Sequence, residues 1–258
     1  MKKRFNKDHL KTWEKEGAVL IKSFFTQNEV ENVKNDFEII FGSHKLKAKK
    51  KPLILKEGEK DSISKEKQFL NFDNIPLNCS KSLNLIALHP SLINFAKKAL
   101  KTRSIHLYQC QIWAKYTGEA DYDQPFHCDF GNHTLTVPSV KNTQNSVTIL
   151  LYFSDVTEEH GPMHFVPRHK SIKITEPKIF KDHNKSIQNK LKYLSASSAS
   201  PAGSIFAYSI DLYHRGTNLI KPYGYRYAIM ACYKKSGNGR EKCEWGLGEF
   251  LEVKAIMS

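Results

Sequence analysis

The N-terminal hundred residues combine helical patterns with one short apolar run. Two helices and one strand are predicted here: helices over residues 7–16 and 91–100, and a strand over residues 18–22. Between the strand over residues 18–22 and the helix over residues 91–100, Thr26 and Glu29 have the spacing of a capping box. Apolar residues then follow at helical spacing up to Ile40, which predicts a helix over residues 27–41 with one side packed on a sheet.

Beyond residue 103 the chain changes to short runs rich in β-branched and aromatic residues, separated by Gly, Pro, Asn and Asp. Such runs are typical of strands, and we predict them over residues 104–116, 147–153, 204–208 and 226–234. Short strands behind a helical entry predict one α+β, mainly β domain over residues 1–258, built on a β-sandwich or barrel. Its expected parts are a helical N-terminal part, a β core and a C-terminal extension: residues 1–103, 104–235 and 236–258.

Two polar segments interrupt these patterns. Residues 45–67 contain nine lysines and four acidic residues with little periodicity, which is typical of an exposed loop. Residues 172–200 are also polar and lysine-rich, which predicts an inserted surface loop. Both segments are candidate lids, because a lid would exclude water from a site in the β core. A solvated surface without a lid function is the alternative for each.

The composition narrows the class of protein. The 258 residues carry 40 Lys and Arg against 26 Asp and Glu, a formal net charge of +14, and 40% are hydrophobic. This excludes disordered and low-complexity classes. No apolar run approaches the roughly 20 residues of a membrane span and no signal peptide is visible, and scattered cysteines suit reduced thiols, so we expect a cytoplasmic protein. The charge leaves nucleic acid, an anionic membrane surface and an anionic small molecule as candidate partners.

Candidate chemistry is concentrated in two motifs, F-H-C-D-F and Y-H-R-G-T-N. On an extended strand, His127 and Asp129 project to one face while Cys128 projects to the other. An H-x-D pair alone is a weak signal, but His214 completes two imidazoles and one carboxylate. That facial set holds Fe(II) and leaves positions for a co-substrate and for O2. Arg226, twelve residues after His214, has a guanidinium suited to the distal carboxylate of a 2-oxo acid.

With these residues, the chain resembles the phytanoyl-CoA dioxygenase family of Fe(II)/2-oxoglutarate-dependent oxygenases through most of its length. The motifs that carry the resemblance are G-x-V-L-I-x-x-F-F-T at residues 17–26, the H-x-D pair, D-V-T-E-E-H-G-P-M-H-F-V-P-R-H-K at residues 155–170, and H-R-G-T-N at residues 214–218 with Arg226 behind it. The resemblance implies a double-stranded β-helix core, a jelly-roll or cupin-like fold, with N-terminal helices packed on it.

The resemblance also implies roles for individual residues. The expected iron ligands, and therefore the catalytic residues, are His127, Asp129 and His214. 2-Oxoglutarate is expected at Arg226, with Lys115 nearby, because related enzymes have a lysine twelve residues before the first ligand. Some relatives have a serine two residues after the distal histidine. This chain has Gly216 there, so a hydroxyl contact to the co-substrate would have to come from Thr217.

Three more residues are predicted with less support to line the substrate pocket: Gln109, Tyr122 and Phe130. Gln109 lies six residues before Lys115, so the period of two places both on one face of a strand. The other two belong to an aromatic group around the iron motif, most of which is core. His160 and His164 are separated by a Gly-Pro turn that excludes a helical zinc pair, and we interpret both as structural.

The reaction implied by the resemblance is oxidative decarboxylation of 2-oxoglutarate to succinate and CO2, coupled to hydroxylation of an unactivated C–H bond. Ascorbate is the candidate reductant. Asp129 favours hydroxylation, because related halogenases have a small residue in its place. The expected substrate is a small or lipid-like, anionic molecule.

Two alternatives stay open. A 2-oxoglutarate oxygenase that modifies nucleic acid would account for the net charge, but no DNA- or RNA-binding motif is present. Related demethylases also have arginines at a different spacing after the distal histidine. A non-catalytic jelly-roll binding module would be marked by lost metal ligands, whereas all three are present. We therefore expect a small-molecule substrate rather than nucleic acid.

Overall fold

The computed structural model of the chain describes residues 3–54, 70–74, 79–121, 123–129, 145–174 and 184–236. Several predicted features lie outside these residues: Tyr122, Phe130, residues 55–67 of the lysine-rich segment and residues 237–258 of the C-terminal extension. The candidate metal ligands and the candidate co-substrate residues are all described.

The larger sheet has six strands in the order β1-β9-β6-β11-β4-β3, and every neighbouring pair is antiparallel. These strands are β1 (Ala18–Ile21), β3 (Leu70–Asn74), β4 (Ile105–Tyr116), β6 (Ser146–Tyr152), β9 (Ile205–Tyr208) and β11 (Tyr225–Lys235). Apart from β3 and β4, strands that pair in this sheet are not consecutive in the chain. The chain therefore crosses away from the sheet between strands, as in a jelly-roll.

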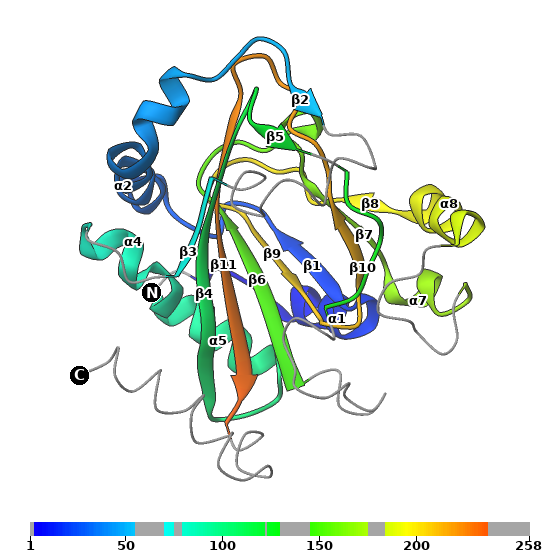
Figure 1. The fold of residues 1–258 in the computed structure, drawn as a ribbon. Coiled ribbons are helices and arrows are strands. Elements are labelled where there is room, and N and C mark those ends of the chain that lie inside the picture. The colour runs from blue at the N-terminus through cyan, green and yellow to red at the C-terminus, as the bar shows by residue number, and fades with distance from the viewer. Residues whose placement is uncertain are drawn as a thin grey trace, which may run out of the picture.

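The segments that leave the larger sheet form strands of a second, smaller sheet. Its strands are antiparallel, in the order β10-β7-β8, with bounds β7 (Met163–Val166), β8 (Ala196–Ser197) and β10 (Tyr213–Gly216). Residues 123–129 extend it, because His127 forms an antiparallel bridge with His214. A separate parallel pair joins β2 (Leu53–Ile54) to β5 (Ala120–Asp121). The two antiparallel sheets form a jelly-roll core, which confirms the predicted fold (Figure 1).

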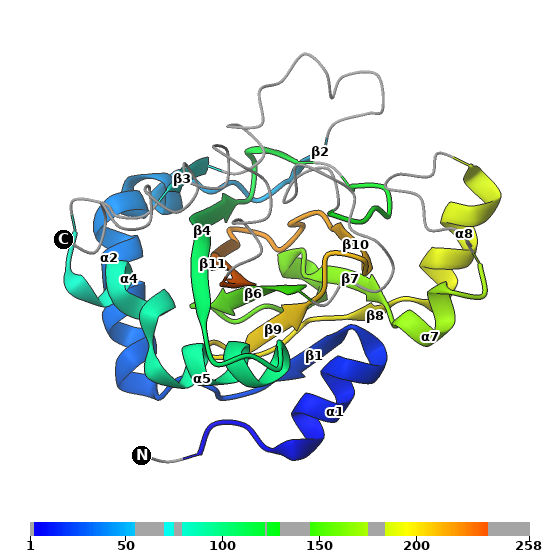
Figure 2. The ribbon, with the colours of Figure 1, turned by 90° about the horizontal axis from the view of Figure 1, so that it is seen from below.

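Helices cover the side of the larger sheet that faces away from the smaller one (Figures 1 and 2). They are α1 (Lys7–Glu16), α2 (Gln27–Leu46), α4 (Lys81–Leu85) and α5 (Pro90–Ala99). Two others, α7 (Arg168–Ser171) and α8 (Lys185–Leu194), lie beside the smaller sheet. Short 3-10 turns occur at Ile86–Leu88 and Glu158–His160. In the described part of the chain, none of the helices has the length and apolar character that a membrane crossing requires.

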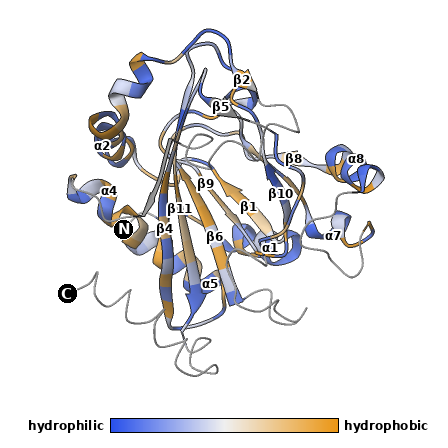
Figure 3. Cartoon of the chain, in the orientation of Figure 1, coloured by the Kyte–Doolittle hydropathy of each residue, from blue (hydrophilic) through white to orange (hydrophobic). Residues whose placement is uncertain are grey.

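The two faces of the larger sheet have different neighbours. On β11, Tyr227, Ile229 and Tyr233 project into the main apolar core with the helices, whereas Met230 and Cys232 join a second cluster on the face toward the smaller sheet. Figure 3 shows β6 and β9 as largely hydrophobic and β10 as hydrophilic. His214 of β10 contacts this apolar face, because its ring centroid lies 4.8 Å from that of Tyr208 on β9.

The predicted N-terminal helices are confirmed. α2 begins with the predicted capping box: Thr26 N–H donates to the Glu29 carboxylate at 2.8 Å, and Glu29 N–H donates to Thr26 Oγ1 at 3.4 Å. The helix continues to Leu46 rather than ending at residue 41. One contact within the helix and one tertiary contact hold this extra turn: Lys45 Nζ lies 2.7 Å from the Glu38 carboxylate and 4.3 Å from the Tyr225 ring centroid on β11.

The interpretation of residues 172–200 as a surface loop is wrong. Much of this segment is α8, which begins after Asn184, whose side chain accepts hydrogen bonds from the first turn. Leu191 is fully buried, and Ile187 and Leu194 pack in the same cluster. These three residues have i, i+4, i+7 spacing. That helical signal was outweighed by the polar, lysine-rich composition around it.

The N-terminal part, residues 1–103, contributes strands as well as helices to the fold. β1 pairs with β9, and β3 pairs with β4, so residues before 104 build both edges of the larger sheet. The strand at β1 was predicted. β3, β7 and β10 were not, because they are only four or five residues long and contain polar residues.

Candidate functional site

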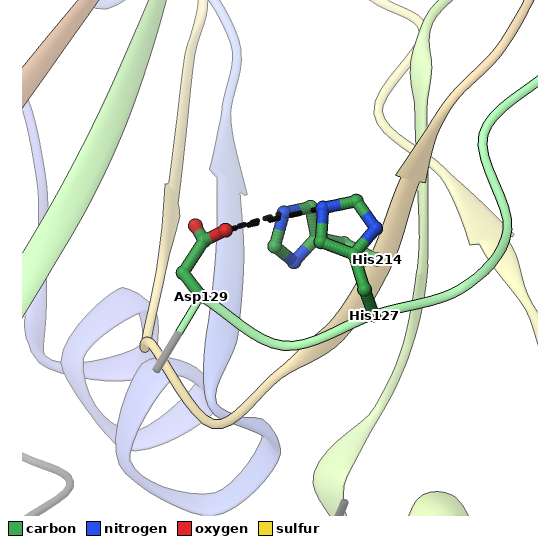
Figure 4. A group of neighbouring side chains, drawn as sticks. All are labelled: His127, Asp129 and His214. Carbon is green, nitrogen blue, oxygen red and sulfur yellow. Dashed lines mark ion pairs between the residues drawn. The ribbon is translucent and has the colours of Figure 1, made fainter. Parts of the chain in front are cut away.

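Three candidate metal ligands converge between the two sheets (Figure 4). His127 and Asp129 come from residues 123–129, and His214 comes from β10. Asp129 Oδ1 lies 3.5 Å from His214 Nε2 and 3.9 Å from His127 Nε2, and one ligand atom from each residue lies within 4.8 Å of the others. Asp129 and His214 are buried, while His127 is partly exposed. The structure thus brings together the three residues that the sequence predicted as ligands.

Backbone hydrogen bonds hold the H-x-D segment against β10. His127 N–H donates to the His214 carbonyl at 3.0 Å, and His214 N–H donates to the His127 carbonyl at 2.9 Å. Asp129 N–H donates to the Ile210 carbonyl at 2.9 Å. The segment forms a single bridge and then turns at Asp129, so the predicted extended strand is shorter than expected. The alternation holds nevertheless, because Cys128 is buried in an apolar cluster away from the ligands.

Backbone carbonyls determine how the two imidazoles face the centre. His127 Nδ1 lies 2.9 Å from the Pro125 carbonyl, and His214 Nδ1 lies 2.9 Å from the Leu212 carbonyl. Because a carbonyl only accepts, each Nδ1 carries the hydrogen and each Nε2 presents a lone pair. Two neutral imidazole nitrogens and one carboxylate oxygen are the donor set that suits a non-heme Fe(II). The residues present therefore fit the metal.

Tyr208 on β9 orients the carboxylate. Its hydroxyl donates to Asp129 Oδ2 at 3.1 Å, which leaves Oδ1 facing both histidines. Burial raises the pKa of Tyr208 well above its usual value, and the negative charge of Asp129 adds to this effect, so the hydroxyl remains a donor. Tyr208 was not singled out from the sequence, where it is one aromatic residue at the end of a buried strand.

Two cationic side chains lie together on the inner face of the larger sheet. Arg226 and Lys115 are direct cross-strand partners on β11 and β4, so they project to the same face, and both are buried. Arg226 Nη1 donates to the Gly161 carbonyl. Two like charges directly opposite each other are unfavourable, so this corner suits a carboxylate of a ligand. That Arg226 and Lys115 hold 2-oxoglutarate stays a prediction.

The Gly-Pro turn before β7 is packed directly on the chain after β10. A side chain at Gly161 would place a Cβ 2.5 Å from the Thr217 carbonyl oxygen, and Gly161 has a φ of +67°. Thr217 Oγ1 donates to the Pro162 carbonyl at 2.6 Å. The Thr217 hydroxyl hydrogen is therefore used inside the protein, so a contact to the co-substrate would use its lone pairs. A Cβ at Gly216 would lie 3.0 Å from Gln124 Oε1.

The remaining predicted residues are placed as follows. Gln109 is half-buried opposite Cys232 and shares the inner face with Lys115, which agrees with the period of two. Its contact with substrate stays a prediction, as do those of Tyr122 and Phe130, which lie outside the described residues. His160 ends a 3-10 turn, and His164 pairs with Glu158 at 2.9 Å, as expected for structural histidines.

Sequence reasoning missed two contacts that hold the segment before His127. The Gln188 side chain on α8 accepts from the Phe126 N–H at 2.8 Å and donates to the Phe126 carbonyl at 3.0 Å. Arg215 Nη1 lies 3.1 Å from Asp123 Oδ2, and its guanidinium lies 5.4 Å from the Phe126 ring centroid. Nothing in the sequence distinguishes Gln188 from other polar residues of α8. Arg215, by contrast, directly follows a candidate ligand.

Comparison with protein families finds one match: the family model described as Phytanoyl-CoA dioxygenase (PhyH) matches residues 13–219. Comparison with curated proteins finds no significant match. The matched range includes His127, Asp129 and His214 but ends before Arg226.

Several solved structures share the fold. The non-heme alpha-ketoglutarate-dependent carbocyclase SnoK from nogalamycin biosynthesis is 14% identical, with a TM-score of 0.63 over 90% of this chain and 85% of that one. HygX from Streptomyces hygroscopicus, solved with nickel and 2-oxoglutarate, is 14% identical, with a TM-score of 0.62 over 90% and 88%. The epimerase SnoN, from the same biosynthesis as SnoK, is 15% identical, with a TM-score of 0.58 over 89% and 82%. At these identities the likeness concerns the fold.

Proposed function

The chain belongs to the phytanoyl-CoA dioxygenase family and is therefore an iron- and 2-oxoglutarate-dependent oxygenase, and from this premise we propose that it hydroxylates an unactivated C–H bond of a small, anionic molecule. One observation carries the proposal. The Nε2 atoms of His127 and His214 both face one oxygen of Asp129, in a buried space between two sheets.

We assign the metal to these three side chains. When bound, Fe(II) supplies the activation of O2 at the expense of 2-oxoglutarate, which leaves as succinate and CO2. The protein orients the ligands: the carbonyls of Pro125 and Leu212 hold the imidazoles, and Tyr208 holds the second oxygen of Asp129. Ligands whose outer partners are fixed need little rearrangement when the metal enters.

Co-substrate binding is assigned to the buried cations. 2-Oxoglutarate is a dianion, and one carboxylate is expected at Arg226 with Lys115 beside it. Fe(II) brings two positive charges and Arg226 one, whereas 2-oxoglutarate brings two negative charges and Asp129 one, so these four groups balance without Lys115. A guanidinium fork also orients a planar carboxylate, which an ammonium cannot do in the same way.

Hydroxylation is the outcome that Asp129 favours, because a carboxylate in that position occupies a coordination site that a halogenase leaves for chloride. Structural neighbours nevertheless include a carbocyclase and an epimerase. These outcomes differ in the fate of oxygen: hydroxylation transfers one atom of O2 to the product, whereas ring closure and epimerisation do not. Turnover under 18O2 with mass spectrometry of the product therefore tests this part of the proposal directly.

The anionic character of the substrate rests on lysines near the site. Four lysines after α2 are exposed: Lys47, Lys49, Lys50 and Lys51. No acidic residue occurs in residues 39–54, and Lys49 N–H donates to the Thr117 carbonyl at 2.7 Å, which ties this segment to the chain that leads to the iron motif. Clustered positive charge raises the encounter rate of anions and is screened by salt. Turnover of an anionic substrate should therefore fall with ionic strength, and less so after all four lysines are changed to glutamine.

The central test measures succinate formation with Fe(II), 2-oxoglutarate and ascorbate against a panel of anionic and neutral compounds. Asp129→Ala should lower substrate-dependent succinate by more than the roughly 10- to 100-fold typical of losing an outer partner of a ligand. Asp8→Ala is the control, because this carboxylate on α1 is 83% exposed and its ion-pair partner is Lys11. Full turnover by Asp129→Ala would refute the ligand assignment. Stimulation by single-stranded nucleic acid alone would favour the nucleic-acid alternative.

A further inference from the structure

One turn of the chain contacts all of the candidate ligands. Residues 208–214, from the end of β9 into β10, supply Tyr208 to the Asp129 carboxylate and the Ile210 carbonyl to the Asp129 N–H. The Leu212 carbonyl holds Nδ1 of His214, which itself bridges His127 through two backbone hydrogen bonds. A displacement of this turn therefore changes the position or orientation of every ligand.

An ion pair anchors the middle of this turn from outside. The Asp211 carboxylate accepts from Arg168 Nε at 3.1 Å and from Arg168 Nη2 at 2.9 Å. Arg168 Nη1 also donates to the Glu14 carbonyl at the end of α1, at 3.0 Å. Asp211 lies between Ile210 and Leu212, whose carbonyls hold the ligands. The guanidinium thus joins the helical layer to the part of the turn that faces the metal centre.

The end of α1 is shaped to receive this arginine. Gly17 caps the helix with a φ of +72°, and a Cβ there would lie 3.1 Å from Arg168 Cζ. The Gly17 carbonyl accepts from the Ser209 N–H at 2.9 Å, which gives the turn a second attachment to the same place. The last carbonyls of a helix carry partial negative charge, so a cation is favoured beside them. Arg168 therefore contacts two negative partners at once.

We propose that Arg168 and Asp211 are a positioning pair that sets the geometry of the metal ligands through the 208–214 turn. This inference rests on the proposed metal site. A bidentate arginine–carboxylate pair fixes orientation as well as distance, because two parallel hydrogen bonds resist rotation. An ion pair that is largely buried contributes little net stability compared with apolar packing, so its main effect here is on the placement of the turn.

A second arginine–carboxylate pair, between Arg4 and Glu29, serves as a matched control. Arg4 Nη1 and Nη2 lie 2.7 and 2.9 Å from the Glu29 carboxylate, again in bidentate geometry. The side chains are 15% and 25% exposed, against 17% and 7% for Arg168 and Asp211. The Arg4–Glu29 pair attaches the N-terminal segment to α2. A change there reports the cost of losing such a pair without moving the 208–214 turn.

The experiment measures Mn(II) affinity of the apo-protein, from the free Mn(II) electron paramagnetic resonance signal in an anaerobic titration, beside the midpoint of thermal unfolding. Asp211→Asn and Arg168→Lys should each weaken Mn(II) binding roughly 10- to 100-fold, as for other outer partners of metal ligands. Glu29→Gln should lower the thermal midpoint but change Mn(II) affinity less than twofold. The double variant Asp211→Asn/Arg168→Lys should be no weaker than the weaker single variant, because the two residues act as one unit.

Three results separate the possible failures. If the unaltered protein binds no Mn(II), the proposed metal site is wrong. If it binds Mn(II) and the folded Asp211→Asn and Arg168→Lys variants bind it within twofold, the positioning pair is refuted while the metal site stands. If Asp211→Asn fails to fold, Arg168→Lys decides alone, because it keeps a charge beside Asp211 and removes only the fork. A loss of affinity equal to that of Glu29→Gln would also refute the pair.

Discussion

The two faces of the larger sheet differ in what they bury. On the outer face, Tyr227 stacks on Phe37 of α2 at a centroid distance of 4.8 Å, within a layer of apolar and aromatic side chains. On the inner face, the residue one position earlier in β11 is Arg226, opposite Lys115. One strand thus contributes adjacent residues to an apolar core and to a cationic corner. The alternation of a strand is what allows a single sheet to stabilise the fold on one side and bind a ligand on the other.

Because of this difference, mutations on the two faces should affect different properties of the protein. Changes on the outer face should lower stability and leave metal and co-substrate binding intact, because apolar burial dominates there. Conservative changes of polar side chains on the inner face should act on binding more than on stability, because they keep the packing and remove only hydrogen bonds. The expected effects below run from the largest to the smallest.

The largest effect is expected on the outer face. Phe37 is fully buried and contacts Phe41, Phe153 and Tyr227. Phe37→Ala should destabilise the protein by about 3–5 kcal/mol, through lost burial and the cavity left behind. Urea denaturation measures this loss. Mn(II) affinity at a temperature where the variant is folded should be unchanged, and a parallel loss of affinity would contradict the separation of the faces.

A smaller effect is expected at the cationic corner. Arg226→Lys keeps the charge but removes the fork, so the KM for 2-oxoglutarate should rise roughly 10- to 100-fold, the value of about one to two charged hydrogen bonds. Steady-state kinetics with varied 2-oxoglutarate measure it. Arg4→Lys is the control, because Arg4 also loses a bidentate pair, with Glu29, that does not contact the ligand segment. An equal rise in KM for both variants would remove the co-substrate assignment from Arg226.

Tyr208→Phe should have a more modest effect, a weakening of Mn(II) affinity of about 10-fold, because Asp129 loses the donor that holds its second oxygen. Tyr152→Phe is the matched control. This tyrosine is equally buried on the inner face, but its hydroxyl lies 2.7 Å from Ser198 Oγ rather than beside a ligand. Equal affinities for the two variants would show that the Tyr208 hydroxyl does not orient Asp129.

The smallest expected effect is the pH dependence of stability that comes from Glu29 on α2. Partial burial raises the pKa of Glu29, but hydrogen bonds from Arg4 and Thr26 outweigh it and lower this pKa from 4.5 to about 2. A lowered folded-state pKa stabilises the protein above pH 4.5, and this contribution is lost as the pH falls toward 2. The stability difference between the unaltered protein and Glu29→Gln should therefore be constant above pH 4.5 and shrink below it. Urea denaturation of the apo-protein at several pH values measures this difference.

The elements predicted from the sequence are those whose local residue pattern favours the same structure that tertiary packing requires. The structure confirms the helices α1, α2 and α5, and the strands β4, β6, β9 and β11, which are runs rich in β-branched and aromatic residues. β7 and β10 were missed because each has only four residues and includes polar ones, His164 in β7 and His214 and Arg215 in β10. α8 was missed because its apolar positions are few among lysines, although they are the ones that pack.

The candidate site divides in the same way. The ligand types and their spacing are chemical information in the sequence, so His127, Asp129 and His214 could be named. The groups that orient them could not, because backbone carbonyls such as that of Leu212 have no residue signature, and Tyr208 differs from other buried aromatics only in where Asp129 lies. Arg168 and Asp211 are separated by 43 positions, and only the folded chain brings them together.

The contact between Gln188 and Phe126 has a consequence for association between molecules. Among the residues that the structure describes, the segment 123–129 is the outermost member of the smaller sheet, bridged to β10 on one side. Its other side would offer backbone groups to any passing strand, and such edges invite intermolecular pairing. The Gln188 amide occupies both the N–H and the carbonyl of Phe126. A single side chain thus closes the sheet at the residue before the first ligand, so the ligand segment is protected from strand addition by a second molecule.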